Sequence, residues 1–256
     1  MLTSPEYLLE RIAHHVLGGS SRQAHQLITE AREAGAPATL LIAEVLFPTI
    51  ECLQQLKHDR SVTVRGANMA ARSLTGLLHS LAGEAEKSPL LDRTVLVMAG
   101  PHHTDELGAS ALAALAEVYG FTVFFAGAGL SMEEVAFAAG QLMPDVLLVH
   151  AGLPAERQAV RLMVARCQEV GLWPRSQIAL TGAAVTENDG LGADIAAAGP
   201  LSALELLALC PEHRGQRQGI QQAVMPLAGS DDAVALAPEV VQAFLSRRGV
   251  RRTYLN

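Results

Sequence analysis

The spacing of apolar residues divides the chain into a helical first part and a second part in which strands and helices alternate. Up to about residue 83, apolar positions recur every three to four residues, which is typical of amphipathic helices. Four such segments are separated by short turns and predict a four-helix bundle. The expected helices are 5–17, 21–34, 38–57 and 62–83. Pro48 predicts a kink in the third of these helices.

From residue 92 the pattern changes to continuous apolar runs that end in Gly or a small polar residue. Such runs are typical of strands buried on both faces, and helix-length segments separate them, so we expect a parallel, doubly wound sheet. The expected strands are 94–99, 121–127, 146–152, 177–182 and a short fifth within 192–199. The expected helices of this part are 107–118, 131–141, 154–171 and 200–209.

The fold class is therefore α/β, with three regions. Residues 1–88 form an N-terminal four-helix cap bundle, and the charged, small residues at its end act as a linker. Residues 92–210 form a Rossmann-like or flavodoxin-like sheet domain. Residues 211–256 form a polar connector, broken by Gly and Pro, and a C-terminal helix at about 233–248.

Composition narrows the classes of partner. Half of the 256 residues are hydrophobic, and the formal net charge is −7 with 19 Lys and Arg. A general nucleic-acid binder needs a basic face, so we expect no direct nucleic-acid partner. The one basic cluster is read as a solvated tail and consists of Arg247, Arg248, Arg251 and Arg252.

The three cysteines are Cys52, Cys167 and Cys210, which lie far apart and lack C-x-x-C spacing. A disulfide framework or a zinc site is therefore not expected. The N-terminus has no pattern of a signal peptide, and no run of eighteen apolar residues predicts a membrane span. We expect a reducing, cytoplasmic setting without a membrane partner.

Polar side chains crowd the loop that follows strand 94–99. This loop reads Pro-His-His-Thr-Asp-Glu over residues 101–106, and Gly108 follows where the next helix begins. Ligands bind at the loops after the carboxyl ends of parallel strands. His102, His103 and Asp105 are therefore candidate ligand-binding residues. The alternative is that they are polar loop residues that satisfy backbone groups.

With these residues in view, residues 5–210 resemble the cobalamin-binding module of corrinoid methyl-carrier proteins and of light-sensing cobalamin-dependent regulators. From Tyr7 through LGGSSRQAHQLITEAREAGAPATLLIAEVLFPTIECL, the chain is similar to the family's cap bundle in length, turn placement and the Pro of its third helix. LGADIAAAG resembles the family's last strand, whose backbone lines the pocket for the nucleotide tail. The resemblance implies cobalamin as the cofactor, with haem or bilin as alternatives found among relatives.

The family signature after the first strand is D-x-H-x-x-G or E-x-H-x-x-G, whose His is the lower cobalt ligand and whose acid orients that His. Aligning the Gly with Gly108 places Asp105 at the position of the His and His103 at that of the acid. A carboxylate suits cobalt less well than imidazole does. Three alternatives follow. In the first, a shifted loop brings His103, our candidate metal ligand, or His102 to the cobalt. In the second, the cobalt keeps the cofactor's own base or a water as its lower ligand, and in the third, the module holds another tetrapyrrole or no ligand.

The resemblance implies further cofactor contacts in the loops after the third and fourth strands, where family members contact the nucleotide tail. The corresponding residues are His150, Gly152, Thr181 and Gly182. A Ser is typical near His150, so this residue is a second departure, and a structural role is its alternative. Gly127 allows close approach of a flat ligand or makes a turn.

In the cap of light-sensing members, a Trp and a later Glu-His pair contact the upper face of the cofactor. The corresponding positions here are Lys57, Ala67 and Asn68, so the upper pocket differs unless His58 substitutes. Asn68, a candidate cofactor-binding residue, and Met69 would instead face the interface with the sheet domain. The interpretation that both are ordinary bundle residues is favoured.

Three functions remain open. The first is a sensor or signalling module that binds cobalamin or another tetrapyrrole, and one version of this hypothesis adds a response to light. It would act through a downstream protein or through homodimerisation. The second is a corrinoid methyl-carrier subunit of a methyltransferase system, and the third is a ligand-free interaction protein. No G-x-S-x-G, G-x-x-x-x-G-K or H-E-x-x-H motif is present, so an enzyme in its own right is not expected.

Overall fold

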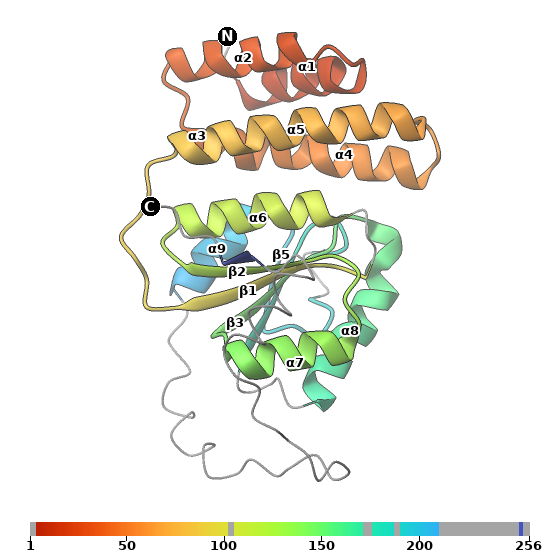
Figure 1. Cartoon of the computed structure of the whole chain (residues 1–256), viewed down its shortest axis with the longest axis vertical. Coiled ribbons are helices and arrows are strands. Elements are labelled where there is room, and N and C mark those ends of the chain that lie inside the picture. Colours follow the sequence, from red (N-terminus) through yellow and green to blue (C-terminus); the bar gives the residue numbers. More distant parts are fainter. Residues whose placement is uncertain (1–3, 102–104, 171–175, 187–189, 210–250, 253–256) are drawn as a thin grey trace.

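The computed structural model describes residues 4–101, 105–170, 176–186, 190–209 and 251–252. Predictions made for other residues, including His102, His103, Cys210, the connector and the helix at 233–248, lie outside this part. Within it the chain forms stacked layers of helices on a sheet (Figure 1). The cap elements are α1 Pro5–Leu17, α2 Ser21–Glu33, α3 Ala38–Leu41, η1 Ile42–Leu46, α4 Phe47–His58 and α5 Val64–Glu84.

The second part alternates strands and helices as the apolar runs predicted. Its strands are β1 Thr94–Ala99, β2 Thr122–Gly127, β3 Val146–His150, β4 Gln177–Thr181 and β5 Ile195–Ala197, with a short β6 Arg251–Arg252. Its helical elements are α6 Glu106–Val118, α7 Met132–Leu142, η3 Pro154–Glu156, α8 Arg157–Glu169 and α9 Pro200–Leu209. The predicted α/β fold class is confirmed. The predicted domain boundaries stay predictions.

The third cap helix differs from its prediction. Instead of one kinked α-helix over 38–57, the chain continues from α3 through the π-helical turn η1 into α4. The ring of Pro48 would overlap the carbonyl of Glu44, four residues earlier, in a regular α-helix. Glu44 lies within the wider π-helical turn, which accommodates the proline without ending the helix.

The same stretch, Ala38–His58, is long and apolar enough to cross a membrane by length and composition alone, within the described part of the chain. However, 56% of its apolar window is buried inside the fold. Core helices of globular proteins pass the same test, and here Leu41, Leu46 and Ile50 pack in the cap. The apolar composition of this stretch therefore has a packing explanation.

The five strands β1 to β5 are parallel, in the order β5-β4-β3-β1-β2. This is the flavodoxin-like order. In this topology, ligands bind where the order of the strands reverses, between β1 and β3. Figure 1 shows α6 and α9 on the face of the sheet toward the cap and α7 and α8 on the other face.

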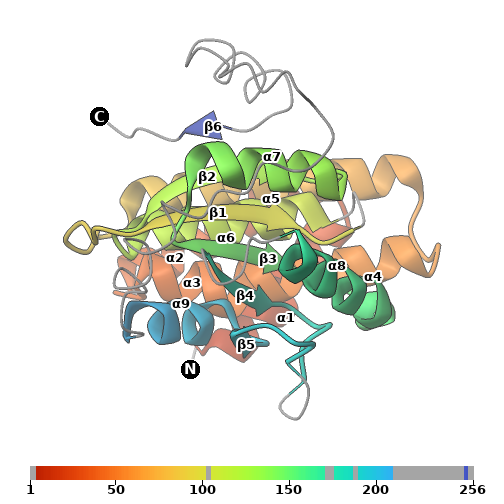
Figure 2. The same ribbon diagram turned by 90° about the horizontal axis from the view of Figure 1, so that it is seen from below.

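One edge of the sheet was not predicted. The short strand β6 pairs antiparallel with β2, through Arg251 opposite Phe125 and Arg252 opposite Phe124 (Figure 2). The backbone of these two arginines thus belongs to the sheet edge, and the interpretation of the basic cluster as a solvated tail stays a prediction. An edge strand such as β2 presents unpaired backbone groups, and these can accept a further strand whatever its side chains.

Two apolar cores lie on the two faces of the sheet. One continuous core runs from the cap through α6 to the near face, where alternate strand residues such as Val97 and Leu148 contribute to it. The other lies between the far face and helices α7 and α8, and includes Met98 and Val149. Because successive strand residues point to opposite faces, His150 shares the near face with Leu148. The cap and the sheet are thus packed as one body.

Polar contacts hold the amino ends of the strands. The buried Arg93 guanidinium donates to the carbonyl of Leu207 and, over 2.9 Å, to Oε1 of Gln177. The Asp145 carboxylate accepts hydrogen bonds from both the backbone N–H (2.7 Å) and the hydroxyl (2.8 Å) of Thr94. These contacts tie β1, β4 and α9 together at the edge away from the predicted ligand loops.

A pair of glycine substitutions tests this packing. Gly120 has φ +88°, and a Cβ there would lie 2.2 Å from the carbonyl oxygen of Pro89. We expect Gly120→Ala to lower the free energy of unfolding by about 2 kcal/mol or more. Gly140 in α7 has open space around it, so Gly140→Ala should raise that free energy by about 0.5–1 kcal/mol. Urea unfolding of both variants measures the difference, and equal effects would contradict the described turn.

Candidate functional site

The carboxyl ends of β1, β3 and β4 meet the underside of the cap, at the position where the strand order reverses. His150 ends β3 and is paired with Ala99 of β1 and Thr181 of β4. Its carbonyl accepts a hydrogen bond of 2.6 Å from the backbone N–H of Gly100, at the start of the loop after β1. The strand ends are therefore held side by side directly below α4.

His150 is the central side chain of this junction. It is fully buried, and neither ring nitrogen has a hydrogen-bond partner among the described residues. Phe47 of α4 meets the imidazole edge-on, with the ring centroids 4.9 Å apart. Burial lowers the pKa of His150 to about 3, so the imidazole is neutral at physiological pH.

Three glycines make room for the imidazole. A Cβ at Gly108 would lie 2.1 Å from Nε2 of His150, and a Cβ at Gly182 would lie 2.9 Å from its Cε1. A Cβ at Gly152 would lie 3.1 Å from Nε2. Gly182 also has φ +107°, which favours glycine. The loops after β3 and β4 and the first turn of α6 therefore surround one ring.

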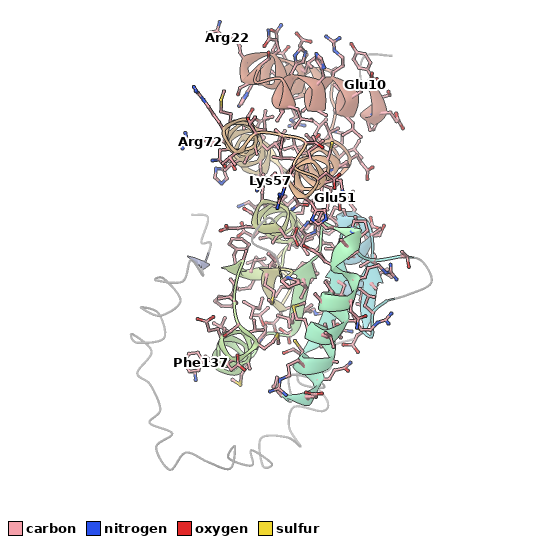
Figure 3. The ribbon with its side chains drawn as sticks, turned by 90° about the vertical axis from the view of Figure 1, so that its right-hand side faces the viewer. Glu10, Arg22, Glu51, Lys57, Arg72 and Phe137 are labelled. Atoms are coloured by element: carbon pink, nitrogen blue, oxygen red, sulfur yellow. The ribbon has the colours of Figure 1, made fainter. Side chains whose placement is uncertain are left out.

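The cap reaches the strand ends through two polar side chains of α4. Gln54 is buried, and its Oε1 would lie 2.0 Å from a Cβ at Gly152, so only a glycine allows this approach. The carboxyl group of Glu51 accepts a hydrogen bond from the backbone of Ala183, in the loop after β4. Figure 3 shows Glu51 and Lys57 at the level of the junction, with Phe137 far below it.

Three carboxyl groups gather beside the histidine. Asp105, fully buried before α6, shares a hydrogen bond with Glu156, and its charge acts on Glu51. Burial raises the pKa of Glu156 and raises that of Glu51 to about 7, although backbone hydrogen bonds from Leu153 and Ala183 oppose these shifts. The hydrogen bond with Asp105 also opposes the shift of Glu156, but burial dominates, so Glu51 and Glu156 take up protons more readily than exposed acids do.

The structure brings together six of the ten predicted site residues. These are Asp105, Gly108, His150, Gly152, Thr181 and Gly182. The hydroxyl of Thr181 donates to the carbonyl of Ala198 over 3.3 Å, so it joins β4 to the end of β5. His102 and the metal candidate His103 lie outside the described residues, and their roles stay predictions.

Two predicted residues lie apart from this group. Gly127 has φ +78° and its nearest side-chain neighbour is Glu106, so the turn after β2 explains the glycine. Asn68 is exposed on α5. Its neighbour Met69, the other candidate for the interface with the sheet domain, is half exposed and lies against Gly19, between α1 and α2. Met69 is therefore a residue of the helix bundle, the interpretation that the sequence favoured, because this side of α5 faces the outer helices.

Sequence reasoning missed Phe47, Glu51, Gln54 and Glu156. A signal was present for Gln54, which lies four residues after Ile50 and seven after Phe47 on a buried helical face. A polar residue at such a position is unusual unless it has a polar neighbour. For Glu51 and Glu156 the sequence contains no local signal, because their partners come from loops that are distant in the chain.

A hollow of about 510 Å³ lies toward the other face of the sheet and reaches the loop after β1, because Gly100 and Pro101 are among its lining residues. Met98, Met132 and Met163 are among its apolar lining residues, and Arg166 and Glu169 stand in its wall as an ion pair of 2.8 Å. Among the described residues, no group of three His, Cys, Asp or Glu side chains could hold a metal ion unaided.

Comparison with known proteins places the fold. No family model matches the sequence, and no curated protein matches it. The monomethylamine corrinoid protein of Methanosarcina barkeri is similar in structure, with a TM-score of 0.64 and 17% identity over 80% of this chain and 98% of that one. The chain therefore has the fold of that corrinoid protein, a helical cap before a Rossmann-like domain, as the resemblance implied.

Two further solved structures match less closely. One is the methanol:cobalamin methyltransferase complex of Methanosarcina barkeri, with a TM-score of 0.40, 19% identity and coverage of 85% of this chain and 86% of that one. The other is a cobalamin-binding protein of Desulfitobacterium hafniense DCB-2, with a TM-score of 0.41, 15% identity and coverage of 78% and 97%. Only the first likeness is close enough to define the fold.

The fit between Gly108 and His150 can be tested by a double-mutant cycle. In the native background, the new methyl group of Gly108→Ala overlaps the imidazole, and we expect a loss of about 1–3 kcal/mol in the free energy of unfolding. In a His150→Ala background the overlap disappears, and the helix-favouring Ala should stabilise by up to about 1 kcal/mol. Urea unfolding of the four proteins measures the coupling. Additive effects would contradict the described contact.

Burial of Glu51 predicts a pH dependence. Its folded pKa of about 7 exceeds the unfolded value of 4.5, so ionisation is disfavoured in the folded state. The protein then loses up to about 3 kcal/mol as the pH rises through this interval. Glu51→Gln should stabilise at pH 8 and have little effect at pH 5.

Chemical unfolding of Glu51→Gln and native protein at both pH values measures this difference. Glu44→Gln, which changes an exposed acid of the same helical stretch, is the matched control. The same effect of Glu51→Gln at both pH values would show that Glu51 is not held in the buried position described.

Proposed function

We propose that this protein binds a corrinoid such as cobalamin at the junction between the helical cap and the carboxyl ends of β1, β3 and β4. The observation that carries the proposal is the junction itself. A cap packs on the reversal point of a sheet whose fold is shared with a corrinoid protein, and a neutral, unpartnered imidazole lies between them. Ligands of this sheet topology bind at that point.

The donor groups of the junction fit a corrinoid in part. The position that matches the family's cobalt ligand holds Asp105, a carboxylate that hydrogen-bonds with Glu156, and such an oxygen suits cobalt poorly. His150 offers an uncharged imidazole instead. The glycines at 108, 152 and 182 let a group lie close to the backbone. The glycines and loop backbones therefore fit a close-lying ligand, whereas the position of the family's cobalt ligand does not fit the metal.

The chain's own residues would hold the cofactor and control access to it. When bound, a corrinoid supplies a cobalt that can carry and exchange an axial group. Phe47 and Gln54 would cover the site from the cap and limit access of water, whereas Thr181 and the nearby loop backbones would line the side toward the sheet. The raised pKa of Glu156 would keep the wall of the site less charged.

Two roles of a bound corrinoid are compatible with this geometry. As a carrier, the protein would present the cofactor to a partner protein. As a sensor, our second candidate, it would couple binding to cap position, because a ligand that enters must break the Glu51–Ala183 hydrogen bond and move Gln54. Light response, an unidentified downstream partner, homodimerisation and a cytoplasmic location belong to this proposal and rest on the sequence alone.

Reconstitution tests the proposal. The purified protein is incubated with hydroxocobalamin, adenosylcobalamin, haemin or biliverdin, in the dark and in light, and then desalted. We expect a retained corrinoid with shifted absorption bands, and no retained haemin or biliverdin. Retention of haemin or biliverdin alone would favour a different tetrapyrrole. No retained chromophore would favour the ligand-free interaction protein.

A matched pair of variants locates the site. Because the ligand has to displace Gln54, Gln54→Ala should favour the open cap and lower the apparent dissociation constant for hydroxocobalamin. Gln55→Ala changes the adjacent, exposed glutamine of α4 and should leave the affinity unchanged. Titrations followed by absorbance give both values. Equal affinities of the two variants would place the binding elsewhere.

A further inference from the structure

The hollow toward the far face of the sheet is suited to apolar side chains. It has a volume of about 510 Å³, and its lining comes from β1, the start of α7 and the length of α8. Met132 and Met163 are lining residues, and the lining residue Leu162 is 62% exposed. Methionine side chains adapt to the shape of an apolar partner, and covering such a surface stabilises by roughly 25 cal/mol per Å². The hollow therefore favours an apolar occupant.

The pairing of β6 brings another part of the chain to the mouth of this hollow. β6 is antiparallel to β2, with Arg251 opposite Phe125. An antiparallel strand begins at the end where its partner finishes, so the chain enters β6 from the side of Gly127. The loop that follows Gly127 carries Leu130 and leads to Met132, and both of these residues line the hollow.

The sequence before β6 has the composition of such an occupant. Residues 233–248, which the sequence predicts to form a helix, lie outside the described residues. Pro238 suits a first helical turn. After it, four apolar residues follow at helical spacing and share one face, namely Val240, Val241, Phe244 and Leu245. Only Gly249 and Val250 separate this stretch from β6, and three extended residues span about 10 Å. The apolar face is therefore within reach of the hollow.

Charge at this corner of the sheet is complementary to the same stretch. Arg247 and Arg248 follow directly after the apolar residues. Glu106 is exposed, and its Oε1 would lie 3.7 Å from a Cβ at Gly127, at the end of β2. Glu133 is exposed in the first turn of α7. Such pairs add little stability at a surface, but they fix the direction in which a segment lies.

We propose that residues 233–248 dock on the hollow as an amphipathic helix, with Phe244 inserted among its methionines. The chain supplies this occupant at a high effective concentration, because β6 anchors it beside the hollow. Gly100 and Pro101 also line the hollow and begin the loop after β1, so the docked segment would support that loop from the far face. The inference does not depend on a bound corrinoid.

Photocrosslinking of the full chain tests the docking. A p-benzoylphenylalanine in place of Phe244 keeps an aromatic side chain, and its ketone reacts on irradiation with nearby C–H bonds, those of methionine above all. We expect mass spectrometry to find intramolecular crosslinks to peptides that contain Met132 or Met163. The same group in place of Ser246, on the opposite face of the expected helix, should not form them. Crosslinks from position 244 only to other parts, only between two copies, or none at all would overturn the docking.

Methionine oxidation provides a second measurement. We expect hydrogen peroxide to oxidise Met132 several-fold faster in Phe244→Glu than in the native protein, because the charged side chain does not enter the hollow. Ser246→Glu, which adds the same charge on the opposite face, should oxidise at the native rate. Met69, half exposed on α5, is the internal reference, and circular dichroism verifies the fold of both variants. Equal rates for Met132 in all three proteins would contradict the docking and favour a separate small molecule in the hollow.

Discussion

The rest of the structure depends on the packing of the cap onto the sheet. One continuous apolar core extends from the outer helices through α4, α5 and α6 to the near face of the strands. The buried leucines and isoleucines that link the layers each contribute roughly 1.5–3 kcal/mol relative to exposure. The buried polar residues of the junction destabilise the fold, and this apolar frame offsets their unfavourable free energy. Without it, His150 and the three nearby carboxyl groups would be solvated, and burial would no longer shift the pKa values of His150, Glu51 and Glu156.

That frame gives the junction two opposing properties. It is tightly closed, because Gln54 approaches the loop after β3 so closely that a Cβ at Gly152 would lie 2.0 Å from its Oε1. It is also costly, because it holds an imidazole without a hydrogen-bond partner among the described residues, and acids whose pKa values are raised by burial. A ligand that satisfied these groups would recover part of that cost and would have to open the cap. In the proposed function, binding would therefore be coupled to cap movement, whether the protein serves as a carrier or as a sensor.

The departure at position 105 makes sense in this context. An acid there would be a poor cobalt ligand, yet it makes a favourable buried contact with Glu156, from the turn that follows β3. The imidazole that the motif lacks is present one strand away, at the end of β3. The parallel register places these two strand ends side by side.

The sequence by itself determined the elements and their order. A helical period of 3.6 residues and a continuous apolar run both depend only on residues close together in the chain. The sequence therefore predicted the bounds of α1 and β1 and the order of the helical cap before the sheet. It also indicated loops that the structure brings together, through Asp105, Gly108, His150, Gly152, Thr181 and Gly182. The π-helical turn before Pro48 and the pairing of Arg251 and Arg252 with β2 did not follow, because each depends on how a strained or unpaired backbone is accommodated.

Only the tertiary structure decided which of the candidate groups share a site. Glu51, Gln54 and Glu156 have no local pattern that marks them as functional, and their importance comes from contacts with loops about 50 to 130 residues away in the chain. Burial, too, is a property of the assembled layers. It separates His150, neutral and enclosed, from the exposed Asn68, although both were equal candidates in the sequence. The chemistry of a side chain is written in the sequence, but its solvation and its neighbours are set by the packing of distant segments.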